Sequence, residues 1–555
     1  MADVASARRL DPQSRSRPAG TVSDAPRPSA THLLWGQLLY ASRDAWRTPV
    51  SLLITLVLPL LFLAVSGLAV GATPGATTGV TVGPDIQRLV PGAAVFAIAM
   101  AAFVMLAFSV ARAAERGVLK RLHGTPLPAW AYLAGRTGAA AWVAVAGTTL
   151  MVVVGAAAYG LEVTPRALPA AVVGLLVTVV AFAALGLAVA TLVRGAEAVL
   201  SISMGSVVLL GFVSDLYGFE AQLPGWLAAV GWALPLRHAV EVMALPFTPG
   251  VTGSGMAVVS LLALLAWGTV GALAAAWSFG REPRTAGGPL RRAGRSSAGS
   301  SPFSYGTNGP LGMVWGQVRY ANRSIWREPV FAGFALVLPT LFVTILPQAV
   351  GNPEIDGVPF AASMVTGMPV FGLALTAYVA LPELVASARD RGLLKRLRGT
   401  PLPAWAFLVG RILSVFWITS ITIAIVLLAG WLVYDTAPSG SGWPALVLVL
   451  AVGIACFAAL GMAVAALVPD ADTVPAVTLA TFLPLVFLSG IFPLGDTLPD
   501  IIPAITAWLP LAPLVDAVRE SFSTGGLLLR ELAVVVGWAV LGVVVAVTRF
   551  RWAAP

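Results

Sequence analysis

The sequence carries little charge, a single cysteine and few histidines. Of its 555 residues, 11% are charged and 58% are hydrophobic, whereas about a quarter of the residues in a soluble domain are charged. The lone Cys456 excludes an intrachain disulfide and a cysteine metal cluster, and His32, His123 and His238 are too scattered for a zinc site. Several apolar runs reach about 20 residues, the length that crosses a bilayer core. The sequence therefore predicts a polytopic membrane protein.

Other chemical signatures are also missing. No G-x-x-x-x-G-K-[ST] sequence occurs, so the chain lacks the loop that holds ATP phosphates in P-loop ATPases, and it has no room for a soluble ATPase domain of roughly 200 residues. No paired carboxylates, histidine cluster or Ser/His/Asp set stands out on one membrane face, so we predict no catalytic, cofactor-binding or metal-binding residues. The net charge of +9 comes from basic residues at the ends of apolar runs, which does not indicate a nucleic-acid partner.

One 20-residue segment occurs twice. Residues 117–136, GVLKRLHGTPLPAWAYLAGR, return as residues 392–411, GLLKRLRGTPLPAWAFLVGR, with 16 of 20 positions identical and an offset of 275. A basic segment broken by glycine and proline does not fit a lipid-facing span. Lipid phosphates would explain the individual charges but not the identical Gly-Thr-Pro-Leu-Pro-Ala-Trp stretches, because only a protein partner requires backbone shape as well. We predict two surface loops that contact a partner protein.

A second repeated segment precedes the first apolar run of each half. Residues 33–48 place apolar side chains on one face of a helix and polar ones on the other, which predicts an amphipathic helix at the membrane interface. Residues 315–330 match residues 35–50 at 10 of 16 positions. The tryptophan and arginine side chains suited to the interface are Trp35, Arg43, Trp46, Arg47, Trp315, Arg323, Trp326 and Arg327.

The apolar runs predict two sets of six spans. We expect them at about 50–70, 90–111, 137–160, 168–193, 197–217 and 254–279, and at about 330–350, 362–386, 412–434, 442–468, 472–491 and 526–550. An even number of spans returns the chain to its starting side, so the halves form a parallel repeat. The predicted fold class is an all-α polytopic membrane protein with about 12 transmembrane helices, arranged as two parallel six-helix repeats that each follow an amphipathic interfacial helix.

Charged and polar segments predict the domain boundaries and the orientation. We expect a disordered cytoplasmic tail at residues 1–30, the first half at 31–280, a cytoplasmic linker at 281–312 and the second half at 313–555. The first 30 residues lack the apolar core of a signal peptide, so the first span should act as the insertion signal. Basic residues beside the spans gather on the side of the repeated loops. By the positive-inside rule this side and both termini are cytoplasmic.

Within each repeated loop we predict a helix, a sharp turn and a second short helix. The second span continues as a helix through Leu122 in the first copy and Leu397 in the second, and Gly124 and Gly399 stop it. The next helix starts with threonine as the cap and proline in the first helical position, at Thr125-Pro126 and Thr400-Pro401.

These features resemble the ABC-2 type family of ABC-exporter permeases. The resemblance rests on the interfacial helix, the six spans, the E/D-R-G-x-L-K-R-L-x-G-T-P-L loop after the second span, and the stretch Phe487-Leu-Ser-Gly490-Ile-Phe-Pro493 after the second half's fifth span. It covers nearly the whole chain except the tail and the linker. It implies that the interfacial helices are connecting helices and that the loops dock on an ATP-binding subunit. The coupling residues that it implies are Glu115, Arg116, Gly117, Lys120, Arg121, Gly124, Thr125, Pro126, Asp390, Arg391, Gly392, Lys395, Arg396, Gly399, Thr400 and Pro401.

The resemblance also implies how such a protein works. Permeases of this family usually carry one six-span unit, so this chain resembles a fused, complete transmembrane pair. ATP and Mg are expected in the partner ATPase, whose closure moves two halves that meet at their first, second and fifth spans. The near-identity of the two loops favours a homodimeric ATPase. We expect export of a hydrophobic or amphiphilic small molecule (a drug, an antibiotic or a lipid-like compound) across the cell (plasma) membrane of a bacterium. Membrane lipid is a further expected partner.

The outer ends of the two fifth spans differ. Where the second half has Phe-Leu-Ser-Gly-Ile-Phe-Pro, the first has Phe-Val-Ser-Asp-Leu-Tyr-Gly, with Asp215 at the end of a span, where a carboxylate is costly. Asp215 either reaches the outer headgroups or makes an asymmetric contact in a gate. Two more residues of this side, His238 and Glu241, form a weaker candidate cluster before the sixth span, but we expect them to be solvated loop residues. The candidates for the outer gate or translocation path are Asp215, Ser489, Gly490, Phe492 and Pro493.

Two other functional classes stay open. A proton- or sodium-coupled secondary transporter of 12 spans is also built from two six-span repeats, but it should carry ionisable residues deep in its spans, and almost none lie at mid-span here. A lipid scaffold or an assembly factor without transport is also compatible with the sequence. Dependence of activity on ATP, or on a proton or sodium gradient, distinguishes these classes.

Overall fold

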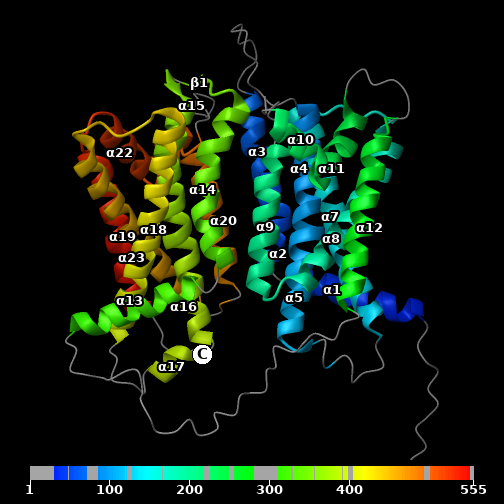
Figure 1. Cartoon of the computed structure of the whole chain (residues 1–555), viewed down its shortest axis with the longest axis horizontal. Helices are drawn as coiled ribbons and strands as arrows, with labels where there is room; N and C mark the ends of the chain where they lie inside the picture. The colour runs from blue at the N-terminus through cyan, green and yellow to red at the C-terminus, as the bar shows by residue number, and fades with distance from the viewer. Residues whose placement is uncertain are drawn as a thin grey trace, which may run out of the picture.

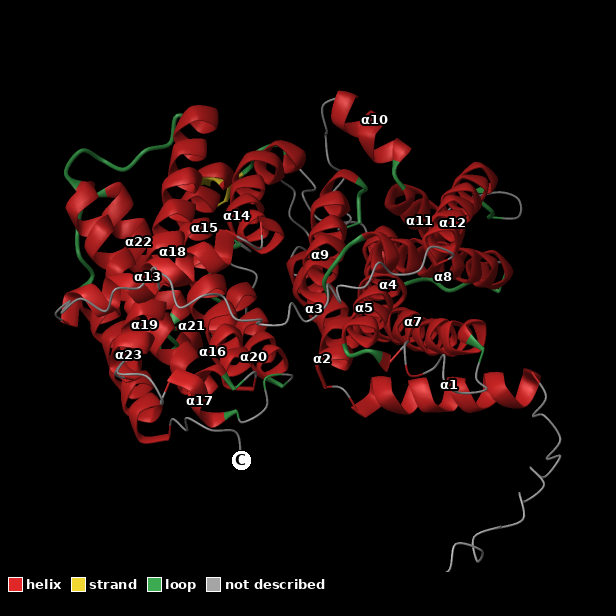
Figure 2. Ribbon diagram, turned by 60° about the horizontal axis from the view of Figure 1, so that its bottom comes forward, coloured by secondary structure: helices red, strands yellow, loops and turns green. Residues whose placement is uncertain are grey.

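The structure of the chain is a computed structural model. Its helices form two bundles that stand side by side (Figure 1). Helices α1 and α13 lie across the same end of the two bundles (Figures 1 and 2). We call this end, where the repeated loops lie, the loop face, and the opposite end the far face. The structure describes residues 30–47, 49–71, 86–118, 121, 128–165, 167–216, 225–248, 255–279, 310–326, 329–355, 357–390, 392–397, 404–468, 471, 473–492 and 501–549.

The first bundle contains the predicted interfacial helix and the helices of the first half. Its described elements are α1 (Ala30–Arg47), α2 (Pro49–Leu52), the π-helix η1 (Leu53–Val57), α3 (Leu58–Gly71), α4 (Ile86–Ile98), the π-helix η2 (Ala99–Met105), α5 (Leu106–Glu115), α7 (Ala129–Tyr159), α8 (Ala167–Leu192), α9 (Ala196–Val213), α10 (Gly225–Ala233), α11 (Pro235–Ala244), the 3-10 helix η3 (Leu245–Phe247) and α12 (Val258–Phe279).

The second bundle repeats this order, and a short hairpin lies on its far face. Its described elements are α13 (Pro310–Trp326), α14 (Pro329–Val350), β1 (Glu354–Ile355), β2 (Val358–Pro359), α15 (Phe360–Ala374), the π-helix η4 (Leu375–Ala380), α16 (Leu381–Asp390), α17 (Leu393–Leu397), α18 (Ala404–Tyr434), α19 (Gly442–Leu467), α20 (Val474–Leu488), α21 (Ile501–Thr506), α22 (Leu511–Ser523) and α23 (Leu529–Arg549). The two strands pair antiparallel, with Glu354 opposite Pro359.

The helices match the predicted membrane spans. Within the described residues, eight helices are long and apolar enough to cross a membrane: Ile86–Glu115, Trp130–Tyr159, Ala167–Leu192, Val258–Ser278, Phe360–Asp390, Val409–Tyr434, Gly442–Leu467 and Leu529–Arg549. Four shorter apolar helices, Leu53–Ala64, Ala198–Val213, Leu336–Gln348 and Val474–Leu488, lie where the first and fifth spans are predicted. The all-α, two-repeat membrane fold is confirmed, while length alone does not establish a count of twelve spans.

The second span is the central helix of each half. In α4–η2–α5 and in α15–η4–α16, 89% of the apolar stretch is buried, against 28% and 11% in the sixth spans α12 and α23. Both central helices contain a π-helical segment. In these segments Leu106 N–H donates to the carbonyl of Ala101, and Leu381 N–H donates to that of Thr376, five residues earlier in each case.

The fourth span packs closely on each π-helical segment. A Cβ atom on Gly186 would lie 2.8 Å from the carbonyl oxygen of Phe103, and one on Gly461 would lie 2.4 Å from that of Ala377. Only glycine fits at this spacing, which explains why the repeated Phe-Ala-Ala-Leu-Gly sequence ends in glycine. The phenylalanine that opens it makes an edge-to-face contact with the second span, at 6.2 Å between centroids in both halves (Phe103–Phe182 and Tyr378–Phe457).

The halves meet through their first and fifth spans. Helix α9 packs on α14, and α20 packs on α2, η1 and α3. The rings of Phe212 and Phe342 cross this interface at a centroid distance of 5.1 Å. Leu479 and Leu483 of α20 pack against the buried clusters of both halves. The fifth span of each half is therefore in position to respond to movement of the other half.

Candidate functional site

Each repeated loop begins with a break in the helix. Helices α5 and α16 end at Glu115 and Asp390, and Gly117 and Gly392 follow with the same left-handed φ of +69°. A left-handed residue ends a helix, and glycine adopts this conformation without strain. The prediction that the second span continues unbroken through Leu122 and Leu397 is therefore wrong. In the second copy a separate short helix, α17, ends at Leu397 (Figure 1).

The carboxylate at the start of each loop is bonded to the backbone at the entry to the fifth span, which is the first residue of α9 in the first half and the turn just before α20 in the second. The Glu115 side chain accepts a hydrogen bond of 2.9 Å from the backbone N–H of Ala196, and Asp390 accepts one of 3.1 Å from the N–H of Ala471. The two pairs are equivalent, because each partner is 275 residues from its counterpart. A carboxylate here satisfies a free N–H and interacts favourably with the helix dipole. The loop is thus attached to the helix that reaches the interface between the halves.

The second half has an additional contact at this point. Arg389 is buried, and its guanidinium donates to the carbonyls of Ala465 (2.9 Å) and Val468 (2.7 Å) at the end of the fourth span. The equivalent residue in the first half is Ala114, and there Arg112 lies over the ring of Phe108 at 5.4 Å. Sequence reasoning treated these arginines only as charges on one side of the membrane. An alignment of the two halves would have shown that Arg389 has no equivalent arginine in the first half, where Arg112 stands two residues before the equivalent position.

The other end of each loop is attached to the interfacial helix. A Cβ atom on Gly135 would lie 2.5 Å from the Cβ of Gln37 in α1, and one on Gly410 would lie 2.4 Å from the Cβ of Gln317 in α13. These glycines permit close packing of the interfacial helix on the third span in both halves. Figure 2 shows α1 alongside α7 in this arrangement.

The charges beside this contact differ between the halves. In the first half Arg136 makes an ion pair of 2.7 Å with Asp44 and lies over the ring of Tyr132. The equivalent Arg411 is buried against the ring of Phe407 at 5.6 Å, and serine replaces Asp44 at the equivalent position of α13. The close helix packing is common to both halves, and the ion pair is not.

The structure places part of the predicted coupling and interfacial residues. The side chains of Arg116, Arg121 and Lys395 are exposed on the loop face, and so are those of Arg43, Trp35, Trp46, Trp315 and Arg323 on the interfacial helices. Arg396 belongs to α17, and Arg47 and Trp326 are the last residues of α1 and α13. The remaining predicted residues, Lys120, Gly124, Thr125, Pro126, Arg327, Arg391, Gly399, Thr400, Pro401 and the far-face Pro493, lie outside the described residues.

The far-face end of each fifth span turns at a left-handed residue. This residue is Asp215 in the first half, at φ 57°, and Gly490 in the second, at φ 76°. The turn packs on the second span: a Cβ atom on Gly92 would lie 2.2 Å from the carbonyl oxygen of Leu216, and one on Gly367 would lie 2.8 Å from that of Ile491. The second span therefore contacts the fifth at both ends.

An arginine holds each turn, but by a different contact. The Asp215 carboxylate, 9% exposed, forms ion pairs of 3.4 Å with Arg88 and 3.3 Å with Arg237. In the second half Arg519 donates to the backbone carbonyl of Gly490. The sequence left two alternatives for Asp215, the outer headgroups or a contact present in one half only. The structure shows the carboxylate in contact with Arg88 and Arg237. An ionised aspartate tolerates the left-handed backbone better than other non-glycine residues do.

Aromatic rings close the interface beside the far-face turns. Phe342 of the second half's first span contacts Phe212 of the other half at 5.1 Å and Phe492 at 5.8 Å. Phe492 also stacks on Phe487 at 5.8 Å. The candidate Ser489 is buried and donates to the carbonyl of Val486, so it stabilises the end of α20.

The expectation of solvated loop residues is wrong for His238. Both His238 and Glu241 belong to helix α11, and His238 is buried, with Nδ1 3.2 Å from the hydroxyl of Ser260 in the sixth span. Leu234-Pro235 starts this helix, because proline is favoured in the first turn. In the described part of the chain no three His, Cys, Asp or Glu side chains are grouped to hold a metal ion.

Two comparisons bear on this arrangement. A family model described as "ABC-2 type transporter" matches residues 32–247 and residues 314–523, one region in each half. A search of curated proteins finds no match. The two matched regions include both interfacial helices, both repeated loops and both far-face turns.

Proposed function

The chain belongs to the ABC-2 type transporter family, and from this premise we propose that it is the complete transmembrane part of an ATP-driven exporter. A separate ATPase subunit docks on the two repeated loops and supplies the ATP and Mg, since the chain carries no P-loop sequence. The exported compound is hydrophobic or amphiphilic: a drug, an antibiotic or a lipid-like molecule.

The attachment of each loop at both ends supports this proposal most strongly. At its start the loop is bonded to the fifth span through Glu115 or Asp390, and at its end it leads into the third span, where Gly135 or Gly410 packs on the interfacial helix. Force applied to such a loop is delivered to several elements at once. A loop that only contacted lipid headgroups would not require equivalent attachments in the two halves.

The second span transmits the movement across the membrane. It leads directly into the loop, it is the most buried of the long spans in each half, and it packs on the far-face turn through Gly92 or Gly367. Closely packed interiors transmit displacement instead of absorbing it. When the ATPase draws the loops together, the fifth spans tilt. The rings of Phe212 and Phe342 then separate, and the far face opens between the halves.

The partner and the orientation follow from the loops. The loop face and both termini are cytoplasmic, because basic residues gather there, and the protein lies in the cell membrane of a bacterium. Each loop presents an exposed basic side chain, Arg121 in the first half and Lys395 in the second, and the loop sequences are identical at 16 of 20 positions. A homodimeric ATPase therefore fits the near-identical loop sequences better than two different subunits.

A gradient-driven transporter receives less support from the side chains. Such a transporter needs a buried ionisable group that binds and releases the coupling ion. Among the described Asp, Glu, His, Lys and Arg residues, the buried ones are His238, Arg389 and Arg411. An arginine keeps its proton, and His238 contacts Ser260 at the far-face start of the sixth span, not at mid-span. We therefore favour ATP as the energy source.

Purification of the tagged chain in mild detergent tests the proposal. The expected companion is a P-loop ATPase at two copies per chain, with ATP hydrolysis in the purified complex. Arg121→Ala with Lys395→Ala removes one exposed charge from each loop and should lower ATPase recovery at least fivefold. The matched control, Arg194→Ala with Arg319→Ala, removes two exposed charges from the same face outside the loops. Equal recovery with both variants, or transport that depends on a proton gradient, contradicts the proposal.

A further inference from the structure

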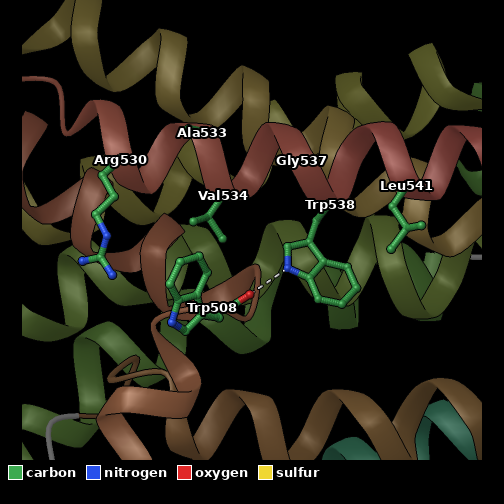
Figure 3. A pocket seen from close by; sticks show the side chains of 7 residues that line it. All are labelled: Trp508, Arg530, Ala533, Val534, Gly537, Trp538 and Leu541. Carbon is green, nitrogen blue, oxygen red and sulfur yellow. Dashed lines mark hydrogen bonds between the residues drawn. The ribbon is translucent and has the colours of Figure 1, made fainter.

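A pocket of about 450 Å³ lies at the far-face end of the last span. Its lining includes Trp508, from the turn between α21 and α22, and five residues along α23: Arg530, Val534, Gly537, Trp538 and Leu541. Figure 3 shows the two indole rings on either side of Val534, with Arg530 beside Trp508 and Leu541 beyond Trp538. The pocket thus has a charged end and an apolar length that follows the helix away from the far face.

Specific contacts hold the aromatic walls of this pocket in place. The indole N–H of Trp538 donates to the backbone carbonyl of Trp508 at 2.8 Å, and the Arg530 guanidinium lies over the Trp508 ring at 5.7 Å. The floor between them is open, because a Cβ atom on Gly537 would have no neighbour within 4 Å. The pocket therefore has two held aromatic walls and an open floor at Gly537.

The guanidinium retains most of its hydrogen-bonding capacity. The Arg530 side chain is 65% exposed, and its ion pair with Glu531, at 3.7 Å, is longer than a hydrogen bond. Glu531 is only 20% exposed. A guanidinium has five N–H donors in a planar arrangement that matches phosphate oxygens. The end of the pocket nearest the far face is therefore suited to a phosphate group.

The pocket opens toward lipid. Helix α23 is the least buried of the long spans, with 11% of its apolar stretch inside the protein, and the lining residues Trp508 and Leu541 are exposed. An arginine and two tryptophans at the end of a span lie where lipid headgroups meet the hydrocarbon. We propose that this pocket binds one phospholipid of the surrounding bilayer, with its phosphate on Arg530 and an acyl chain along Val534, Gly537 and Leu541.

The first half shows that this pocket is not a general feature of the fold. There the indole of Trp267 donates to the carbonyl of Ala233, the residue equivalent to Trp508. The acceptor carbonyl is equivalent, but the donor lies one helical turn beyond Ala263, the residue equivalent to Trp538, and alanine stands in place of the Trp508 ring and Gly255 in place of Arg530. A lipid site in one half only would give the two sides of the transporter different lipid surroundings.

Native mass spectrometry of the purified full chain tests the proposal, with phosphatidylglycerol and diacylglycerol of the same acyl chains as probes. The wild type should retain one phosphatidylglycerol per chain under conditions that strip other lipid. Arg530→Ala should lower its retention about tenfold, and diacylglycerol binding should not change. Arg549→Ala, which removes an exposed arginine from the other end of the same helix, should have no effect.

A second variant tests the acyl-chain part of the site. Gly537→Leu fills the pocket, and because a Cβ atom there meets no neighbour, the chain should fold normally. Retention of both probes should fall about tenfold. Equal phosphatidylglycerol retention in the wild type and Arg530→Ala, or an equal loss in Arg549→Ala, would overturn the phosphate site. Unchanged retention in Gly537→Leu would overturn the acyl-chain placement.

Discussion

At the loop face the two halves share the contacts that attach the loops, although the arginines beside these contacts differ, and at the far face they hold equivalent turns by different contacts. At the loop face, Glu115 and Asp390 accept equivalent hydrogen bonds, and Gly135 and Gly410 pack on equivalent glutamines. At the far face, equivalent turns are held by two ion pairs in one half and by a bond from Arg519 to a carbonyl in the other.

This difference distinguishes the loops, which must both bind the same partner, from the far-face turns, which need not bind a common partner. Two loops that bind copies of one ATPase must present the same shape, so equivalent contacts at their ends are required. The far-face turns have no such requirement, because the contacts described for each come from its own half and from the facing first span. We expect symmetric variants to behave alike at the loop face and unlike at the far face.

The largest effect is expected where the fourth span crosses the second. Gly461→Ala places a Cβ atom 2.4 Å from the carbonyl oxygen of Ala377, and Gly186→Ala places one 2.8 Å from that of Phe103. Both should destabilise the protein, by about 1–3 kcal/mol, and Gly461→Ala should do so more. The fraction of monodisperse protein after heating measures this. Gly537→Ala, in open space, is the control and should change little.

Breaking the ion pairs at the far face should have the next largest effect. Asp215→Asn keeps a side chain that tolerates the left-handed backbone but removes the charge between Arg88 and Arg237. The expected loss is about 1–2 kcal/mol, seen as a lower apparent melting temperature. Asp215→Ala should lower it further, because alanine also strains the turn. Wild-type melting of Asp215→Asn would show that the ion pairs do not hold the turn.

At the loop face the two halves should respond equally. Glu115→Ala and Asp390→Ala each remove the acceptor of one backbone N–H at the start of a fifth span. Hydrogen exchange of peptides that contain Ala196 or Ala471 should become about fivefold faster, the equivalent of about 1 kcal/mol. Glu162→Ala, at an exposed far-face carboxylate, is the control. A change in only one half would contradict the equivalence of the loops.

The smallest effect is expected for the tryptophans of the sixth spans. Trp267→Phe and Trp538→Phe each remove one indole hydrogen bond to an equivalent carbonyl. Each should cost about 0.5–1.5 kcal/mol, measured as a small shift in melting temperature. Only Trp538→Phe should also weaken phospholipid retention, since the other half has no aromatic wall at this position. Loss of lipid in both variants would contradict a one-sided site.

The sequence predicted those features that depend on local pattern. Apolar runs located the helices, and the internal repeat located the loops and the interfacial helices, because periodicity and repetition are visible along one chain. The same repeat contained Gly117 and Gly392 but did not indicate their left-handed conformation, so the helix was extended too far.

Contacts between distant residues could not be predicted in the same way. Asp215 was identified as unusual, but its partners Arg88 and Arg237 lie far from it in sequence, on helices α4 and α11. The hydrogen bonds of Glu115 and Asp390 depend on the end of one span lying beside the start of another. The pocket at Trp508 depends on a turn folding back against a helix. Each of these contacts follows from packing, which no local pattern specifies.

Electron paramagnetic resonance distances across the far face test most directly whether the loops control this face. Spin labels at Trp226→Cys and Ile505→Cys, both exposed residues in opposite halves, would be placed in a Cys456→Ala chain bound to its ATPase. ATP with Mg should shift the distance between the labels by several Å, and Glu115→Ala with Asp390→Ala should reduce the shift. An unchanged distance while ATP is hydrolysed and substrate is transported would contradict the account.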